Sequence, residues 1–310
     1  MYFRVIKMYD IIIVGAGPAG LTAAIYAKRA NKNVLILEKN GFGGQITSSP
    51  KVENYPGFES VSGSELADSI VSQVLAQGAD VEIEAVTEIK DNGKTKTVIT
   101  EEGNEYESLA VIIAGGAKHR HLGLPNEEKF IGEGISFCAV CDGAFYTNKT
   151  VALIGGGNSA LQEAILLCET CKKVYVVQNL DFLTGEERLQ EILRSRGNAE
   201  IITGAVVSEI PDSDKLSSII IKKTATGEET TLEIDGMFVA IGLEPENENF
   251  KNVADLDKFG YIDTDETCAT KTQGVFVAGD CRKKTVRQVA TAVADGAVAA
   301  ISACRYIDAL

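Results

Sequence analysis

Short apolar runs recur along the 310-residue chain, and amphipathic segments separate them. An unbroken apolar run is typical of a strand buried on both faces, whereas apolar residues at every third or fourth position indicate a helix. The alternation of these patterns predicts parallel sheets covered by helices. The predicted strands include 11–14, 34–37, 109–114, 151–154, 174–177 and 274–280.

Weaker patterns fill the intervals between these strands. We expect an amphipathic helix near 63–77 and an alanine-rich helix at the carboxyl end. Two β-like segments, 81–89 and 95–100, are separated by the Asp-Asn-Gly turn signal at 91–93. The sequence therefore predicts an α/β fold with two Rossmann-like, three-layer nucleotide-binding domains.

A glycine-rich turn between a predicted strand and a predicted helix occurs twice, which places one such turn in each domain. The second domain is expected to be inserted into the first, so that the first is discontinuous. The predicted boundaries are 1–118 with 245–310 for the first domain and 119–244 for the second.

The first turn reads Gly15-Ala-Gly17-Pro-Ala19-Gly20. In this context Gly15 permits the tight turn, Gly17 lets the backbone approach a pyrophosphate, and Gly20 lets the helix pack close to the strand. The phosphates then lie on the exposed amides of the helix N-terminus. Glu38 ends the next apolar run, where an acid holds a ribose 2′-hydroxyl.

The second turn, Gly155-Gly-Gly157-Asn-Ser-Ala160, lacks the residue that selects a nicotinamide cofactor. Gln178 lies as many residues after Gly155 as Glu38 lies after Gly15. An acid at that position would hold a ribose, and a nearby arginine would accommodate a 2′-phosphate. The sequence Gln178-Asn-Leu offers neither, so one nucleotide site is complete and the other is disabled.

Candidate chemistry lies in Cys138-Ala-Val-Cys141-Asp142. Two cysteines at this spacing can close a small disulfide if they open a helix, and a helix N-terminus lowers the pKa of a thiol. Reduction of a disulfide passes through a mixed disulfide, and the released thiolate is then protonated. Asp142 is a candidate general acid if burial raises its pKa; the alternative is that it caps a helix.

The remaining cysteines have less specific patterns. A zinc site formed by both Cys-x-x-Cys pairs is disfavoured, because a strand, a glycine-rich turn and a helix lie between them. We expect no metal, and we expect Cys168 and Cys171 to end a helix, one packed and one near the surface. Buried thiols are expected at Cys268, Cys281 and Cys304.

Composition narrows the class of protein. The net charge of −14 disfavours nucleic acid as a partner, and no apolar stretch approaches the roughly 20 residues of a membrane span. The start, MYFRVIKMYD, is too short and polar for a signal peptide. Seven cysteines, an odd number, suit a reducing cytoplasm, and a cytoplasmic location is therefore expected.

The motifs in this order resemble those of the low-molecular-weight thioredoxin reductases over essentially the whole chain. Besides the first glycine-rich turn and the Cys-x-x-Cys-Asp-Gly segment, the matching pieces are Gly43-Gly-Gln45, Val52-Glu-Asn54-Tyr-Pro-Gly57, Gly279-Asp280 and Arg287-Gln288. The resemblance implies FAD in the discontinuous domain, a dithiol domain that rotates, thioredoxin as the partner and a homodimer. It also implies that Cys141 faces the flavin and that Cys138 forms the mixed disulfide with thioredoxin.

The resemblance assigns further residues to FAD. Glu38 would hold the adenosine ribose, Gln45 and Asn54 would line the flavin, and Asp280 would bind the ribityl chain. Arg287 and Gln288 would lie beside the pyrophosphate and the flavin ring. The full predicted set is Gly15, Gly17, Ala19, Gly20, Glu38, Lys39, Gly44, Gln45, Asn54, Val86, Ala114, Gly115, Gly279, Asp280, Arg287, Gln288 and Val289.

The departures from the family pattern concern the electron donor. Members that use NADPH carry a His-Arg-Arg run where this chain has Gln178-Asn-Leu, and fixed cations are needed to bind a 2′-phosphate. This departure resembles the ferredoxin-dependent flavin thioredoxin reductases, which implies reduced ferredoxin as the donor. Two alternatives stay open: NADPH or NADH bound in a nonstandard pocket, and a redox-sensing flavoprotein without turnover.

A basic run, Arg282-Lys283-Lys284, follows the Gly279-Asp280 motif in this strongly acidic chain. One interpretation is a solvated loop. The other is a positive patch near the flavin that steers an acidic ferredoxin to the enzyme, an effect that acts mainly on the association rate.

Overall fold

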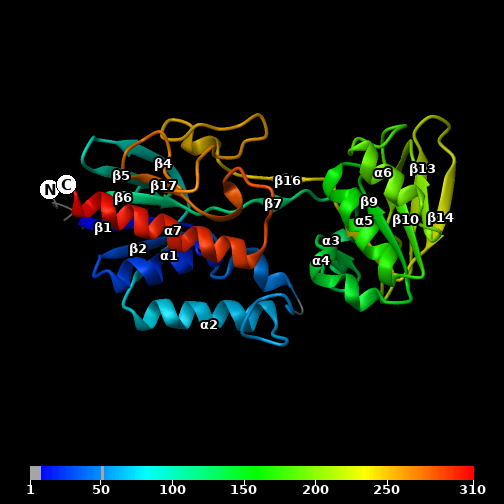
Figure 1. The fold of residues 1–310 in the computed structure, drawn as a ribbon, viewed down its shortest axis with the longest axis horizontal. Coiled ribbons are helices and arrows are strands. Elements are labelled where there is room, and N and C mark those ends of the chain that lie inside the picture. The colour runs from blue at the N-terminus through cyan, green and yellow to red at the C-terminus, as the bar shows by residue number, and fades with distance from the viewer. Residues whose placement is uncertain (1–7, 50–51) are drawn as a thin grey trace. The chain divides into compact units, whose positions relative to one another are not determined.

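The computed structural model describes residues 8–49 and 52–310, so the first seven residues, which bear on the signal-peptide prediction, lie outside it. The chain forms two compact units (Figure 1). The first unit comprises Met1–Lys118 and Glu244–Leu310, and the second comprises His119–Leu243. The chain passes between them in β7 (Lys118–His119) and β16 (Leu243–Glu244), which pair with each other.

A sheet with the strand order β3-β2-β1-β6-β5-β4 forms the centre of the first unit, and β17 pairs with β6. Strands β1, β2, β3, β6 and β17 are mutually parallel where they pair, whereas β4, β5 and β6 pair antiparallel. The bounds are β1 Met8–Val14, α1 Pro18–Arg29, β2 Val34–Glu38, η1 Gly44–Ser48, α2 Gly63–Ala76, β3 Asp80–Ile83, β4 Val86–Asp91, β5 Lys96–Thr100, β6 Glu105–Ile113, η3 Glu248–Phe250, β17 Val275–Val277, η4 Gly279–Cys281 and α7 Val289–Asp308.

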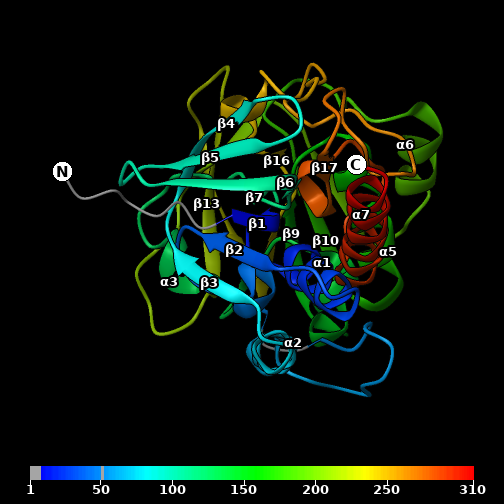
Figure 2. The ribbon, with the colours of Figure 1, turned by 90° about the vertical axis from the view of Figure 1, so that its left-hand side faces the viewer.

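Strand β1 shows why an apolar run predicts a central strand. Ile11 and Ile13 point into one core, which α1 and α7 cover, and Ile12 and Val14 point into a second core on the opposite face. Helices α1 and α7 lie side by side over the first of these faces (Figure 2). Because both faces are buried over Ile11–Val14, the successive residues of this part of the strand are all apolar.

The second unit is built on a parallel sheet with the order β11-β10-β9-β15-β8. Helix α5 packs on one face, and the antiparallel sheet β12-β13-β14 covers the other. The bounds are α3 Glu127–Phe130, β8 Ile135–Ser136, α4 Ala139–Asp142, η2 Gly143–Tyr146, β9 Thr150–Ile154, α5 Asn158–Thr170, β10 Lys173–Val177, α6 Glu187–Arg194, β11 Ala199–Ile202, β12 Ala205–Glu209, β13 Ser218–Lys223, β14 Glu229–Glu233 and β15 Gly236–Val239.

The predicted α/β class is confirmed, with two differences in detail. The segment 81–89 is not one strand: β3 pairs with β2, and the chain then turns so that β4 pairs with β5. In the second unit, strands rather than helices cover one face of the parallel sheet, because the apolar side chains of β12, β13 and β14 face it.

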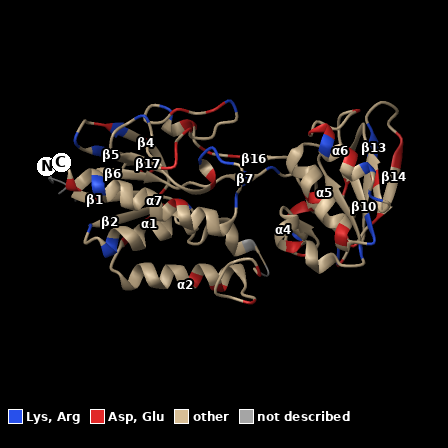
Figure 3. Cartoon of the chain, in the orientation of Figure 1, with Lys and Arg blue, Asp and Glu red and all other residues tan. Residues whose placement is uncertain are grey.

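Charged residues are spread over both units, with Lys and Arg interspersed among the more numerous Asp and Glu (Figure 3). Within the described residues, no helix combines the length and apolar character needed to span a bilayer.

Candidate functional site

The glycine-rich turn of the first unit connects β1 to α1 and leaves space at the start of the helix. Gly15 has a φ of 106°, which favours glycine, and a Cβ on it would overlap the Ala114 carbonyl. A Cβ on Gly20 would overlap the Gly15 carbonyl, so this glycine lets α1 pack against the turn. Beside Gly17, the N-cap of α1, no described atom lies within 4 Å of a Cβ position. The turn thus has the open approach that a pyrophosphate on the α1 amides requires.

Glu38 is the last residue of β2, and its carboxylate reaches back to this turn. Its Oε2 accepts a hydrogen bond from the Ala16 amide at 2.7 Å, and its Oε1 accepts one from the Asn40 amide at 2.9 Å. A carboxylate has about four acceptor positions, so both oxygens can also accept from ribose hydroxyls. The acid therefore lies beside the phosphate-binding turn, where a bound nucleotide places its ribose.

The other predicted residues near this turn come from neighbouring elements. Lys39 forms an ion pair with Glu246. Ala114 is buried directly after β6, and next to Gly115 no described atom lies within 4 Å of a Cβ position. Val86, the first residue of β4, is half-buried against the core formed by the opposite face of β1.

Predicted flavin-lining residues are brought together from distant parts of the chain. Gly44 begins η1, and the Gln45 side chain donates a hydrogen bond to the Ala117 carbonyl. The Asn54 amide donates to the Gln288 side chain at 3.1 Å, and Gln288 is the N-cap of α7. Val289 is the first residue of that helix.

Gly279 and Asp280 follow β17 and face α1. The Cα of Gly279 is close to Ala19 of α1, since a Cβ added to Gly279 would lie 2.8 Å from the Cβ of Ala19. Asp280 is largely buried, burial raises the pKa of its carboxyl, and its Oδ1 has no hydrogen-bond partner among the described residues. Arg287 donates to the Asp280 carbonyl at 3.3 Å. A buried oxygen without a partner suits a ligand hydroxyl, so these residues fit FAD.

The predicted positive patch at 282–284 is wrong. Arg282 and Lys284 are both largely buried and share the Asp295 carboxylate, at 2.8 and 2.7 Å respectively. Lys283 is exposed and pairs with Asp263 at 3.1 Å. These cations are neutralised by their own chain, and Asp295 also accepts from the Gly279 amide at 3.1 Å. The basic run therefore holds the Gly279-Asp280 turn in place rather than forming a free positive surface.

In the second unit, Cys138 and Cys141 form a disulfide at the start of α4, with their Cα atoms 5.3 Å apart. Cys138 is the N-cap of the helix, and its sulfur accepts a hydrogen bond from the Cys141 amide at 3.2 Å. Val140 between them is 57% exposed, so the surface beside the disulfide is apolar and accessible. Amides at a helix start stabilise a thiolate, so this geometry favours a reactive sulfur at Cys138.

Asp142 is the last residue of α4 and the N-cap of η2, but its side chain makes no capping hydrogen bond. Its Oδ2 accepts a hydrogen bond from the Ser136 hydroxyl at 2.6 Å, whereas its buried Oδ1 has no partner among the described residues. Burial raises the pKa of this carboxyl, and the hydrogen bond from Ser136 opposes part of that effect. A carboxyl that keeps its proton to higher pH beside a disulfide can act as a proton donor.

Glu163 of α5 is a residue of the site that the sequence pattern did not reveal. Its Oε2 accepts a hydrogen bond from the amide of Ala139, the first helical residue of α4, at 3.2 Å. Burial raises the pKa of the Glu163 carboxyl to about 7, and the Ala139 amide opposes part of that rise. No local spacing connects Glu163 with the cysteines, because only the packing of α4 on α5 brings them together.

The glycine-rich turn of the second unit is altered in structure as well as in sequence. Gln178 is buried, and its side chain lies against Gly156, where an added Cβ would be 2.6 Å from the Gln178 Cδ. The Gly156 carbonyl accepts hydrogen bonds from the amides of Thr184 and Gly185 at 2.8 and 2.9 Å. The connection between β10 and α6 therefore packs directly on this turn.

An acidic group also lies at the start of α5. Glu186 accepts a hydrogen bond from the Asn158 side chain at 3.1 Å, and the Glu186 amide donates to Asn158 Oδ1 at 2.7 Å. Asn158 is the first residue of α5, where a Rossmann-like unit binds a pyrophosphate. A carboxylate here repels phosphate, and Glu187 beside it pairs with Arg194 at 2.8 Å.

The other cysteines are buried and remote from this chemistry. The expectation that one of Cys168 and Cys171 lies near the surface is wrong: both are buried at the end of α5, and burial raises the pKa of each thiol. The expected burial of Cys268, Cys281 and Cys304 is confirmed. Such thiols are poor nucleophiles, because burial in apolar surroundings disfavours the thiolate.

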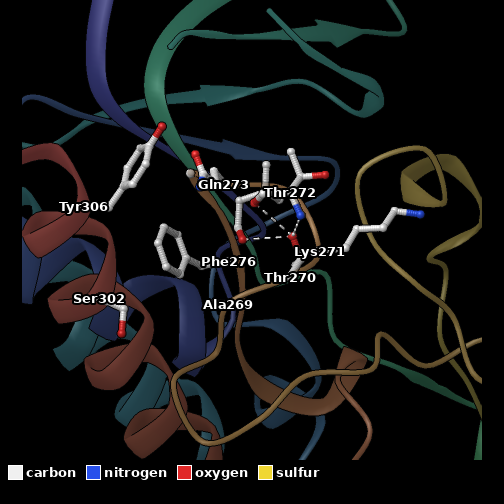
Figure 4. Close-up of a pocket in the computed structure, with 10 residues that line it drawn as sticks. Ala269, Thr270, Lys271, Thr272, Gln273, Phe276, Ser302 and Tyr306 are labelled. Atoms are coloured by element: carbon white, nitrogen blue, oxygen red, sulfur yellow. Dashed lines mark hydrogen bonds between the residues drawn. The ribbon is translucent and has the colours of Figure 1, made fainter. Parts of the chain in front are cut away.

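A cavity of about 290 Å³ in the first unit lies between the 269–276 segment and Ser302 and Tyr306 of α7 (Figure 4). The Thr270 hydroxyl fixes its rim by donating to the Val275 carbonyl at 3.0 Å and accepting from the Thr272 amide at 3.2 Å. None of the predicted cofactor residues lines this cavity, so it is not part of the candidate site.

Comparison with known proteins identifies the family of this chain, which combines a complete nucleotide turn with a Cys-x-x-Cys disulfide. The sequence pattern of the pyridine nucleotide-disulphide oxidoreductases matches residues 9–296. The chain belongs to this family. Its relatives include a 34.2 kDa protein in the rubredoxin operon of Clostridium pasteurianum, which is 42% identical over 302 residues (97% of this chain and 98% of the relative). The thioredoxin reductase of Bacillus subtilis is 40% identical over 305 residues (98% and 96%).

A solved structure gives the same result. The thioredoxin reductase of Streptococcus pyogenes is 39% identical, with a TM-score of 0.92, and the match covers 98% of this chain and 99% of that one. The predicted resemblance to low-molecular-weight thioredoxin reductases is therefore confirmed, as are the enzyme class and the FAD cofactor. The comparisons do not distinguish the ferredoxin-dependent subtype.

Proposed function

We propose that this protein is a cytoplasmic, FAD-dependent thioredoxin reductase that acts through the Cys138–Cys141 disulfide and takes its electrons from reduced ferredoxin. The observation that carries the proposal is the disulfide at the start of α4, with the buried carboxyl of Asp142 in the same helix. The full-length similarity to thioredoxin reductases supports thioredoxin as the substrate.

The first unit supplies the residues that would hold FAD. The amides of α1 beside Gly17 would bind the pyrophosphate, Glu38 the adenosine ribose, and the unpartnered oxygen of Asp280 a ribityl hydroxyl. Bound FAD supplies the electron pair that reduces the disulfide. Asn54 and Gln288, which are hydrogen-bonded to each other, would border the flavin ring.

The second unit performs the thiol chemistry. Two electrons break the Cys138–Cys141 bond, and Asp142 gives its proton to one of the two released sulfurs. The Cys138 thiolate then attacks a sulfur of the thioredoxin disulfide, which breaks that bond and forms a mixed disulfide. The Cys141 sulfur displaces thioredoxin by attacking Cys138, so the enzyme disulfide is restored and thioredoxin leaves as a dithiol after protonation.

The second unit also supports a donor other than a nicotinamide nucleotide. Gln178 takes the position of the ribose-binding acid, and the exposed Asn179 and Leu180 provide no cation for a 2′-phosphate. Glu186 adds a negative charge at the start of α5, where the pyrophosphate would lie. A one-electron protein donor such as ferredoxin needs none of these contacts, since it delivers electrons to the flavin directly.

Anaerobic titration of the flavoprotein with NADPH, NADH and reduced ferredoxin tests the donor. The flavin absorbance should bleach rapidly with ferredoxin and slowly with either nucleotide. Rapid bleaching by micromolar NADPH would instead establish a nicotinamide donor in a nonstandard pocket. Under continuous photoreduction of its flavin, the enzyme should then reduce thioredoxin over many turnovers, whereas a redox sensor would stop after one.

The same similarity supports a homodimer, which equilibrium sedimentation of the FAD-loaded protein at micromolar concentration would detect as a doubling of the 33.1 kDa mass. A mass that stays at the monomer value across the concentration range would contradict it.

A further inference from the structure

A second carboxylate besides that of Asp142 contacts α4, and this one lies at the start of the helix. Glu163 projects from α5, and its Oε2 lies 3.2 Å from the amide of Ala139. Ala139 directly follows Cys138, and the Cys138 sulfur accepts a hydrogen bond from the Cys141 amide at 3.2 Å. The first turn of α4 therefore offers its amides to two acceptors at once, a carboxylate and a sulfur that becomes negative on reduction.

Two negative groups at one helix start repel each other, and partial burial of both Cys138 and Glu163 weakens the screening by solvent. While the disulfide is closed its sulfurs are neutral, and the Glu163 carboxylate alone faces the amides. A thiolate at Cys138 adds a second negative charge to the same partly buried site. Proton uptake by Glu163 removes that repulsion, since the Cys138 thiolate then lies beside a neutral carboxyl.

We propose that Glu163 is a positioning residue of the redox dithiol: it holds the first turn of α4 while the disulfide is closed and takes up a proton when reduction leaves a thiolate at Cys138. This inference rests on the proposed redox role of Cys138 and Cys141. In balance, the disulfide accepts two electrons, one proton goes to one sulfur and a second to Glu163. The proton leaves Glu163 for solvent when Cys138 enters the mixed disulfide.

Glu163 can exchange a proton near neutral pH, as this role requires, because burial raises its pKa to about 7. The carboxylate form is therefore present mainly above pH 7.

The elements packed against α5 carry other titratable groups, yet burial and the Ala139 amide are the two influences on the pKa of Glu163. Those other groups include Asp142 of α4, Tyr146 of η2, Lys173 and Tyr175 of β10, and Glu187, Arg188, Glu191 and Arg194 of α6.

The test measures the apparent pKa of the Cys138 thiol in FAD-loaded protein that carries Cys141→Ser. The readout is the rate at which iodoacetamide alkylates the Cys138 peptide between pH 5 and 10. In this background, Glu163→Gln keeps an oxygen for the Ala139 amide and removes the charge. The apparent pKa of Cys138 should fall by about one unit, which means about tenfold faster alkylation at pH values well below that pKa. Glu163→Ala should give a similar fall.

Glu169→Gln on the same helix is the matched control, because Glu169 is exposed and pairs with Arg196 at 3.5 Å. It should leave the Cys138 profile unchanged. An unchanged profile in Glu163→Gln, a change in Glu163→Ala alone, or an equal shift in Glu169→Gln would each overturn the proposal. The alkylation assay needs neither an electron donor nor thioredoxin. Failure of the proposed function is therefore a separate result, which would be seen as continued turnover without Cys138.

Discussion

The two sulfurs of the disulfide occupy different positions in α4, and this difference predicts different effects of replacing them. Cys138 is the N-cap of α4, whereas Cys141 is within the helix. Cys138→Ser should abolish thioredoxin reduction. Cys141→Ser should leave Cys138 able to attack thioredoxin but unable to release it, so a mixed disulfide should accumulate on non-reducing gels.

Cys168→Ser is the control for this pair, since Cys168 is a buried thiol whose pKa is raised to about 11. It should keep near-normal turnover. If both Cys138→Ser and Cys141→Ser kept near-normal turnover, a different pair such as Cys168 and Cys171 would be the redox centre.

Residues close in sequence could be assigned from the sequence, and residues joined only by packing could not. Cys138 and Cys141 were paired because residues three apart meet in one helical turn. Glu163 was missed because it lies one strand and one glycine-rich turn further along the chain. The internal pairing of Arg282 and Lys284 with Asp295 was missed for the same reason, since α7 brings that carboxylate back to the loop.

At the scale of elements, the proposal of a donor other than a nicotinamide nucleotide rests on the connection between β10 and α6. Asn179 and Leu180 are exposed, so Asn179→Arg with Leu180→Arg can be introduced without disturbing the core. Two charge-assisted contacts to a 2′-phosphate, each about 1.5–3 kcal/mol, should tighten NADPH binding by two or more orders of magnitude. Stopped-flow bleaching of the flavin should show this gain for NADPH and little gain for NADH.

The control adds the same charge elsewhere in the second unit, as Thr230→Arg with Thr231→Arg, two exposed residues of β14. It should leave NADPH reduction as slow as in the parent protein. A gain in this control equal to that of the β10–α6 variant would mean that overall charge, rather than the missing 2′-phosphate contacts, limits NADPH.

Strands with both faces covered were predictable as elements, and exposed strands were not. Residues 11–14 of β1 and 151–154 of β9 read as unbroken apolar runs because each face meets a core. In β4 most side chains are exposed, so its pattern did not show where β3 ended and β4 began. The cover of β12, β13 and β14 over the second sheet was likewise hidden, since each strand has a single buried face.

At the scale of the whole molecule, each unit has its own hydrophobic core. The two cores of the second unit are formed by residues between Leu122 and Ile241, and those of the first unit by residues outside this range. The ends of the second unit lie together, because the Arg120 amide donates to the Gly242 carbonyl at 3.0 Å. A short linker can therefore replace the second unit with little loop-closure cost.

We expect a variant in which a four-residue Gly-Ser linker replaces 120–242 to fold and to bind FAD. It should show the absorbance of bound flavin, and calorimetry should show one cooperative unfolding transition, as expected for a first unit with an intact core. Thioredoxin reduction should be lost, because the disulfide is removed. Asp280→Ala in this variant should weaken FAD binding, since Asp280 supplies the unpartnered buried oxygen. A variant that folds cooperatively but binds no FAD would contradict the assignment of the cofactor to the discontinuous unit. Retention of FAD by the separate 119–243 fragment would contradict it as well.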